Sequence, residues 1–150
     1  MRFVDTNILL YAISTDPGEA AKSGVAIKHL DSTDVALSVQ VLQEFYVQAT
    51  RSSRTGRLSH QQALALIESW LRFSIQETTV EVLRAALETS QRFQLSYWDA
   101  AIIEAARALG CTEVLSEDMN AGQNYGGVRV VNPFLARRRG SGDQGNKRSE

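Results

Sequence analysis

The sequence predicts an α/β domain built around a mainly parallel sheet. Short apolar segments alternate with longer segments whose apolar residues recur at helical spacing, which is the pattern of strand–helix units. A chain of 150 residues has the length of one domain. Parallel sheets of this kind place their functional sites beyond the carboxyl ends of the strands. Polar residues at those positions are therefore the first candidates for function.

The N-terminal part of the chain is expected to form two strands and three helical segments. "MRFV" is typical of a short buried strand, and "ILLYAI" of a helical turn or short helix. Asp16, Pro17 and Glu19 supply an N-cap, a first-turn proline and a capping-box acid for the helix in "TDPGEAAKSGVAIKHL". Residues 34–37 form the second strand, after which Ser38 caps the helix "VQVLQEFYVQATR".

The remaining elements follow from the same signals. Ser59 can cap "HQQALALIESWLRF", a strand "SIQET" follows, and "TVEVLRAALETSQRF" is the next helix. Ser96 begins "SYWDAAIIEAARALG", with Asp99 at the third helical position. "TEVLSED" is expected to be a strand that ends in acids, and "VRVVNP" the last strand. The domain is thus expected to span residues 1–135, with a basic, disordered tail over 136–150.

Composition excludes several classes of protein. The chain is 43% hydrophobic and 22% charged, as is usual for a soluble globular protein. Its one cysteine rules out a disulfide framework. No apolar run approaches the ~18 residues of a membrane-spanning helix, and the N-terminus lacks the features of a signal peptide. The expected location is therefore the cytoplasm.

Four acids occupy positions that could face one edge of the predicted sheet. Asp5 ends the first strand, Asp118 ends the "TEVLSED" strand, Asp99 lies in the first turn of a helix, and Glu44 lies in the helix after the second strand. Each alone also fits an ordinary role, as a turn residue, a cap or a solvated helix residue. Together they would repel one another unless a cation intervened. Mg²⁺ and Mn²⁺ prefer such oxygen ligands, so the pattern indicates a metal site.

Five segments occur in a characteristic order over residues 1–135: "FVDTNILLY", "LQEFY", "LSYWDAAIIEAA" and "VLSEDMNAG", followed by "VRVVNPF". In these segments the sequence resembles the PIN-domain ribonucleases, and among them the VapC-type toxins of toxin–antitoxin pairs. This resemblance implies a three-layer α/β/α fold with a mainly parallel sheet. It also implies endonuclease activity on RNA with Mg²⁺ or Mn²⁺ as cofactor, and a small antitoxin that blocks the site.

The resemblance assigns roles to particular residues. The catalytic and metal-binding acids of the family correspond to Asp5, Glu44, Asp99 and Asp118. Small polar residues that support them correspond to Thr6, Asn7 and Ser116, where the family often has threonine at the last position. Asp118 is preferred to Glu117, because on a continuing strand Ser116 and Asp118 would share one face.

The expected chemistry is attack of a metal-activated water on phosphorus. No nucleophile-elbow motif, Walker-type phosphate loop or persuasive Cys/His pair competes with this hypothesis. An acidic site repels RNA, so bases must attract the backbone. Arg51, Arg54 and Arg57 in the loop "RSSRTGRLS" are the candidates, with a solvated loop as the alternative.

Three other interpretations remain open. The chain could be a non-catalytic PIN-like module that binds RNA or protein, although it keeps all four acids. It could be a phospho-receiver-like domain, but that class needs a late lysine, and none lies between Lys28 and Lys147. The substrate could be DNA.

A homodimer is plausible, because one predicted helix is rich in apolar residues that could equally be core: Leu64, Leu66, Ile67, Trp70 and Leu71.

Overall fold

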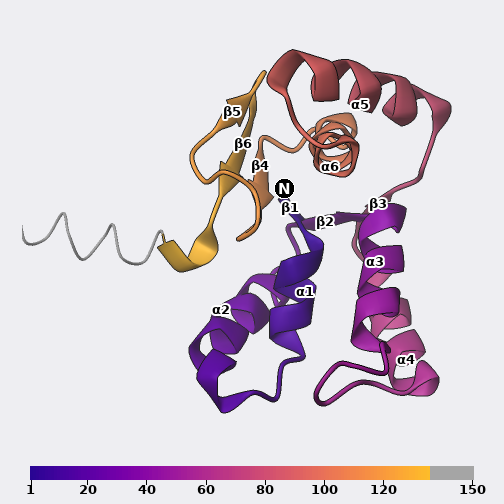
Figure 1. Ribbon diagram of the computed structural model, residues 1–150, viewed down its shortest axis with the longest axis vertical. Coiled ribbons are helices and arrows are strands. Elements are labelled where there is room, and N and C mark those ends of the chain that lie inside the picture. The colour runs from indigo at the N-terminus through magenta and orange to yellow at the C-terminus, as the bar shows by residue number, and fades with distance from the viewer. Residues whose placement is uncertain (136–150) are drawn as a thin grey trace, which may run out of the picture.

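The computed structural model describes residues 1–135 as six strands with helices on both sides of the sheet (Figure 1). The strands are β1 (Arg2–Val4), β2 (Val35–Ser38), β3 (Ser74–Gln76), β4 (Glu113–Leu115), β5 (Asn124–Tyr125) and β6 (Val128–Val131). The helices are α1 (Thr6–Ala12), the 3₁₀ helix η1 (Pro17–Glu19), α2 (Ala20–Leu30), α3 (Val39–Ala49), α4 (His60–Trp70), α5 (Val80–Phe93) and α6 (Tyr97–Ala108). The predicted α/β fold is confirmed, while the expected tail lies outside the described residues.

The sheet has the strand order β3-β2-β1-β4-β6-β5. All neighbouring pairs are parallel except β5 with β6. β1 pairs with β2 on one side and with β4 on the other, where Val4 lies opposite Leu115. The carboxyl ends of these three strands therefore meet at one edge of the sheet, as parallel pairing requires. Each strand delivers the residues that follow it to the same place.

The predicted serine caps are confirmed. The hydroxyl oxygens of Ser38, Ser59 and Ser96 each accept a backbone N–H from the first turn of the helix that follows. The predicted capping box at Asp16 is wrong. The Asp16 side chain accepts from Gly18 N–H and caps only η1, while the Glu19 carboxylate accepts from the Ser14 hydroxyl at 2.6 Å. Glu19 thus stabilises the preceding loop.

The strand expected to reach the acids of "TEVLSED" is shorter than predicted. β4 ends at Leu115, and the residues from Ser116 to Met119 form a bend. Side chains replace the strand partners there, because Asn7 Oδ1 accepts Glu117 N–H at 3.1 Å and Ser116 Oγ accepts Met119 N–H at 3.4 Å. The predicted alternation of side chains along a continuing strand is therefore wrong.

The hairpin β5–β6 was not predicted. Its two-residue turn, Gly126–Gly127, has positive φ at both positions (62° and 101°), which glycine adopts without strain. The Arg107 guanidinium of α6 holds the turn by donating to the carbonyls of Tyr125 and Gly126, both at 2.6 Å. "NYGGV" carried this signal in its glycine pair.

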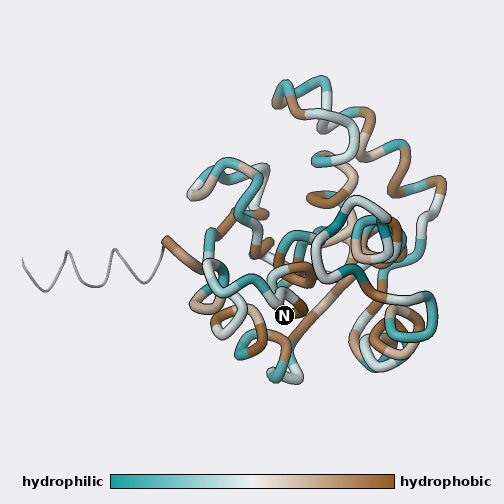
Figure 2. Tube along the Cα trace, turned by 60° about the horizontal axis from the view of Figure 1, so that its bottom comes forward, coloured by the Kyte–Doolittle hydropathy of each residue, from teal (hydrophilic) through white to brown (hydrophobic). Residues whose placement is uncertain are grey.

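The hydrophobic core lies between the sheet and the helices. β1 and α1 contribute side chains with no exposure, among them Phe3, Ile8 and Leu9. Phe45 of α3 packs edge-to-face on Trp70 of α4, with ring centroids 4.8 Å apart. Apolar and polar residues alternate along α5 in Figure 2, as expected for a helix with one side outside the core. No helix of residues 1–135 is long and apolar enough to span a membrane.

Candidate active site

The site begins at the junction between β1 and α1. The chain passes from strand to helix with a single intervening residue, Asp5, which is the N-cap of α1 and is 8% exposed. Its Oδ1 accepts the Thr6 N–H at 2.7 Å. An acid at a helix N-terminus satisfies one unpaired amide and is favoured by the helix dipole. The strand end and the helix cap thus fix the carboxylate at the sheet edge.

The β4 side of the site holds the second oxygen of Asp5. Ser116 is fully buried and donates its hydroxyl to Asp5 Oδ2 at 2.7 Å. The Asn7 amide nitrogen lies 3.2 Å from the same oxygen and 3.3 Å from Asp118 Oδ2. Asn7 therefore links Asp5 to Asp118 from one side chain, while its own oxygen holds the bend after β4.

Glu44 joins the site from α3. The Thr6 hydroxyl donates to Glu44 Oε2 at 2.8 Å, and the Gln40 amide donates to Glu44 Oε1 at 3.0 Å. Gln40 lies one helical turn before Glu44, the spacing at which side chains on a helix meet. The same amide nitrogen lies 3.3 Å from the carbonyl oxygen of Trp98. Gln40 thus connects α3 to the first turn of α6.

Asp99 is linked to the other acids by charge. It is half-buried in the first turn of α6, where its backbone N–H donates to Ser96 Oγ at 3.1 Å. Burial raises its pKa, the Ser96 hydrogen bond lowers it, and the negative charges of Asp118 and Glu44 raise it further. The effect of these charges places Asp99 in the same electrostatic neighbourhood.

Among the four acids, Asp5 has the largest pKa shift. Burial raises its pKa from 3.8 to about 6. Hydrogen bonds from Ser116 and Thr6 oppose the rise, whereas the charges of Glu44 and Asp118 add to it. A carboxylate with this environment is stabilised by any cation that approaches it.

Glu117 points away from the acids. Its Oε1 accepts the Tyr11 hydroxyl at 2.5 Å, and its Oε2 accepts from Lys22 Nζ at 2.6 Å. Asp118 contacts Asn7 instead. The preference for Asp118 over Glu117 thus agrees with the geometry, but its cause is this ion pair and the bend, and not alternation along a strand. The role of Asp118 as a ligand stays a prediction.

The donor set suits a hard divalent cation in its chemistry. Its atoms are carboxylate oxygens, the ligands that Mg²⁺ and Mn²⁺ prefer. Yet no three or more His, Cys, Asp or Glu side chains of residues 1–135 are grouped as a metal site. The hydroxyl of Thr6 and the amide of Asn7 lie between the acids and satisfy them as hydrogen-bond donors. Thr6 thus bridges Asp5 and Glu44 by hydrogen bonds, and Asn7 bridges Asp5 and Asp118.

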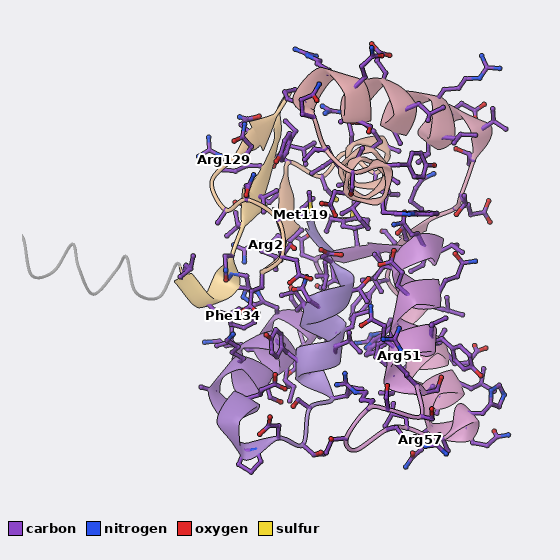
Figure 3. The ribbon with its side chains drawn as sticks, in the orientation of Figure 1. Arg2, Arg51, Arg57, Met119, Arg129 and Phe134 are labelled. Carbon is purple, nitrogen blue, oxygen red and sulfur yellow. The ribbon has the colours of Figure 1, made fainter. Side chains whose placement is uncertain are left out.

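The three candidate arginines occupy different positions. Arg51 lines a depression together with Glu44 and Trp98, and Arg54 lines another together with Asn7. Arg57 lies at the far end of the loop, away from Met119, the residue that follows Asp118 (Figure 3). The loop therefore presents two of its arginines beside site residues and one apart from them.

Sequence reasoning missed Gln40 and Trp98. The spacing of Gln40 and Glu44 was a signal for the first, because residues four apart meet on a helix. Nothing in the sequence identified Trp98 as exposed, since tryptophans in apolar helices are more often buried.

The chain belongs to the PIN domain family, whose model matches residues 2–124. The receiver-like interpretation is therefore wrong. The same fold occurs in a number of solved structures, and three of them illustrate the likeness. The first is a toxin–antitoxin complex from Klebsiella pneumoniae, with 20% identity, coverage of 89% of this chain and 98% of that one, and a TM-score of 0.65. The second is VapC20 from Mycobacterium tuberculosis, with 23% identity, coverage of 79% of this chain and 92% of that one, and a TM-score of 0.61. The third is VapBC2 from Rickettsia felis bound to a promoter DNA fragment, with 18% identity, coverage of 87% of this chain and 97% of that one, and a TM-score of 0.60. VapC20 is described as a toxin that cleaves the sarcin–ricin loop. No curated protein sequence matches the chain.

Proposed function

We propose that this protein is a metal-dependent endoribonuclease and the toxin of a toxin–antitoxin pair. The observation that carries the proposal is the buried Asp5 carboxylate, whose pKa is raised to about 6 beside Glu44 and Asp118 at the carboxyl edge of the sheet. Membership of the PIN family supports a nuclease, and the toxin–antitoxin proteins among the structural relatives support the toxin role.

Asp5, Glu44, Asp99 and Asp118 are the residues that would hold Mg²⁺ or Mn²⁺. When bound at such a site, the ion supplies an activated water and neutralises charge on the phosphate oxygens. Ser116, Thr6 and Asn7 hold the carboxylates in place by hydrogen bonds, a role that supports ligands in metal sites generally. Arg51 and Arg54 attract the RNA backbone toward this acidic edge.

The partners in this proposal are RNA, an antitoxin that covers the acids, and a second copy of the chain, all in the cytoplasm. The apolar residues of α4 are poor candidates for a dimer surface, because Trp70 is buried and Leu66 and Ile67 pack against the core. A more exposed stripe lies on α5. It consists of Val80, Leu83 and Leu87, which are 60%, 41% and 56% exposed. This stripe is the dimer surface we propose.

Cleavage of a mixed cellular RNA pool tests the proposed function. Purified protein is incubated with Mg²⁺, with Mn²⁺ and with EDTA, beside Asp5→Asn as the control. Cutting that requires the metal and disappears in Asp5→Asn supports the proposal, and mapping of the new ends then identifies the target. Absence of cutting by folded, inhibitor-free protein in either metal would contradict it.

The second candidate is a non-catalytic module that binds RNA or protein. One observation favours it, namely that residues 1–135 show no group of three acids already arranged for a metal. In that case the same assay would give RNA binding without cleavage, and Asp5→Asn would bind RNA as the unaltered protein does.

A further inference from the structure

An exposed tryptophan lies directly beside the acids. Trp98 precedes Asp99 in the first turn of α6, and at 63% exposure it is the most exposed large apolar side chain of residues 1–135. It lines a depression of about 370 Å³ whose other wall is α3. This volume falls within the ~300–1,000 Å³ of ligand pockets. Glu44 belongs both to the depression and to the acid network, so the two are continuous.

The lining of the depression combines the groups that recognise an unstacked base. Trp98 and Val47 supply apolar surface. Gln43 supplies an amide that both donates and accepts hydrogen bonds, and Gln40 supplies an amide oxygen that accepts them. Arg51 adds a positive charge. Proteins bind single-stranded RNA by stacking bases on aromatic rings, bonding their edges to polar side chains and pairing phosphates with arginine.

Two contacts position Trp98 at the start of α6, one through its ring and one through its backbone. The Tyr97 ring packs edge-to-face on Trp98, with centroids 5.0 Å apart. The Gln40 amide bridges Glu44 Oε1 and the Trp98 carbonyl, at 3.0 and 3.3 Å. Gln40 thus ties the backbone of Trp98 to the acid, so a base stacked on Trp98 would lie near Glu44.

We propose that this depression binds one unstacked nucleobase of the RNA substrate, with Trp98 as its stacking surface. The base belongs to a nucleotide next to the phosphate that is cut, because the depression shares Glu44 with the acids. This inference rests on the proposed function, since it takes RNA as the ligand. A second protein copy on the same surface would have to desolvate the amides and the Arg51 charge, which is costly without matched partners. RNA supplies those partners.

The two tryptophans of the chain allow a direct test. Trp70 is 5% exposed and packs on Phe45, whereas Trp98 is open to solvent. Trp70→Phe is introduced into Asp5→Asn, so that Trp98 is the only indole and the RNA is not cut. Its emission is followed while a short single-stranded RNA is added. An oligomer of the same length and charge that lacks one base at the bound position is the matched control.

Base stacking should quench Trp98 emission, and the base-lacking oligomer should quench it much less. Trp98→Ala should weaken binding of the complete RNA by about 5- to 150-fold, the range for loss of one base–aromatic stack. Trp98→Phe should restore most of the affinity. Leu71→Ala, at an apolar position of 47% exposure that does not line the depression, should leave affinity unchanged.

Two results would overturn the inference while leaving the nuclease in place. One is Trp98 emission that the complete RNA does not quench, together with unaltered RNA affinity in Trp98→Ala, while the chain that keeps Asp5 still cuts RNA. The other is Trp98 emission that responds to protein concentration and not to RNA, which would assign the surface to a second copy. Failure of every variant to bind RNA would overturn both this inference and the proposed function.

Discussion

At the scale of single residues, the site is a compromise between burial and charge at Asp5. The end of β1 and the α1 cap place the carboxylate at the sheet edge, where burial disfavours its ionised form. Ser116, Thr6 and Asn7 offset part of that cost with hydrogen bonds. The rest persists as a raised pKa. This residual cost is what a bound cation would relieve.

The raised pKa of Asp5 gives the metal-free protein a particular pH dependence. The folded carboxyl holds its proton up to about pH 6 and the unfolded one only to 3.8, so this residue lowers stability as pH rises through that window. The cost above pH 6 is roughly 3 kcal/mol for this buried group. Unfolding in EDTA from pH 4 to 7.5 should show Asp5→Asn losing less stability over the window than the unaltered chain. Parallel curves for the two proteins would contradict this account.

Three of the four acids, Asp5, Asp99 and Asp118, should differ in their importance for cleavage. Asp5 and Asp99 are more buried than Asp118, which is exposed and contacts the site only through Asn7 at 3.3 Å. We expect Asp5→Asn and Asp99→Asn each to lower kcat/KM by about 100- to 1,000-fold, and Asp118→Asn by only ~10-fold. Single-turnover cleavage at saturating Mn²⁺ measures this. Equal losses in all three variants would refute the ranking.

At the scale of elements, the strand ends and helix starts could be predicted, but the bend after β4 could not. The serine caps at Ser38 and Ser96 were visible because capping is a local interaction with a clear residue preference. The bend depends on Asn7, which is 110 residues away in the sequence from its Glu117 partner. No local pattern reports such a contact. Asp5 and Asp118 were proposed from their positions after strands, and Asp99 and Glu44 from helices that could face the same edge. The supporting residues Thr6, Asn7 and Ser116 came from the family resemblance.

The loop between α3 and α4 should contribute to RNA binding unevenly. Arg51 lies beside Glu44, whereas Arg57 lies at the far end of the loop (Figure 3). Arg51→Glu should raise KM and reduce the slope of log affinity against log salt by about 0.7 for each lost phosphate contact. Arg57→Glu is the matched control and should change neither. Equal effects, or none from either reversal, would remove the loop arginine from the RNA-binding surface.

At the scale of the whole molecule, the sheet brings together residues from four separate segments of the chain. β1, β2 and β4 end at one edge, and α6 adds Asp99 to it. The fold could be predicted because alternating short strands and helices restrict a chain of this length to few arrangements. A dimer surface could not be predicted in the same way, because it depends on which apolar residues are exposed. The sequence pattern does not separate exposed apolar residues from core residues, as Leu66, Ile67 and Trp70 of α4 illustrate.

The proposed dimer makes a prediction at this scale. Val80, Leu83 and Leu87 recur along α5 and are exposed. Leu83→Glu with Leu87→Glu should convert a dimer to a monomer, because the interface would have to bury two charges. Light scattering across a range of protein concentrations measures this, with Leu64→Glu on α4 as the control. A dimer that survives the double change would place the interface elsewhere.

Mn²⁺ binding measured by calorimetry on the purified, antitoxin-free protein tests the central claim most directly, because the nuclease proposal depends on the acids holding a cation. We expect the unaltered chain to bind Mn²⁺ at pH 7.5, more weakly at pH 5 where a proton competes for Asp5, and Asp5→Asn to lose this binding. Absence of binding, or binding equal in the two proteins, would show that the acid network is not a metal centre.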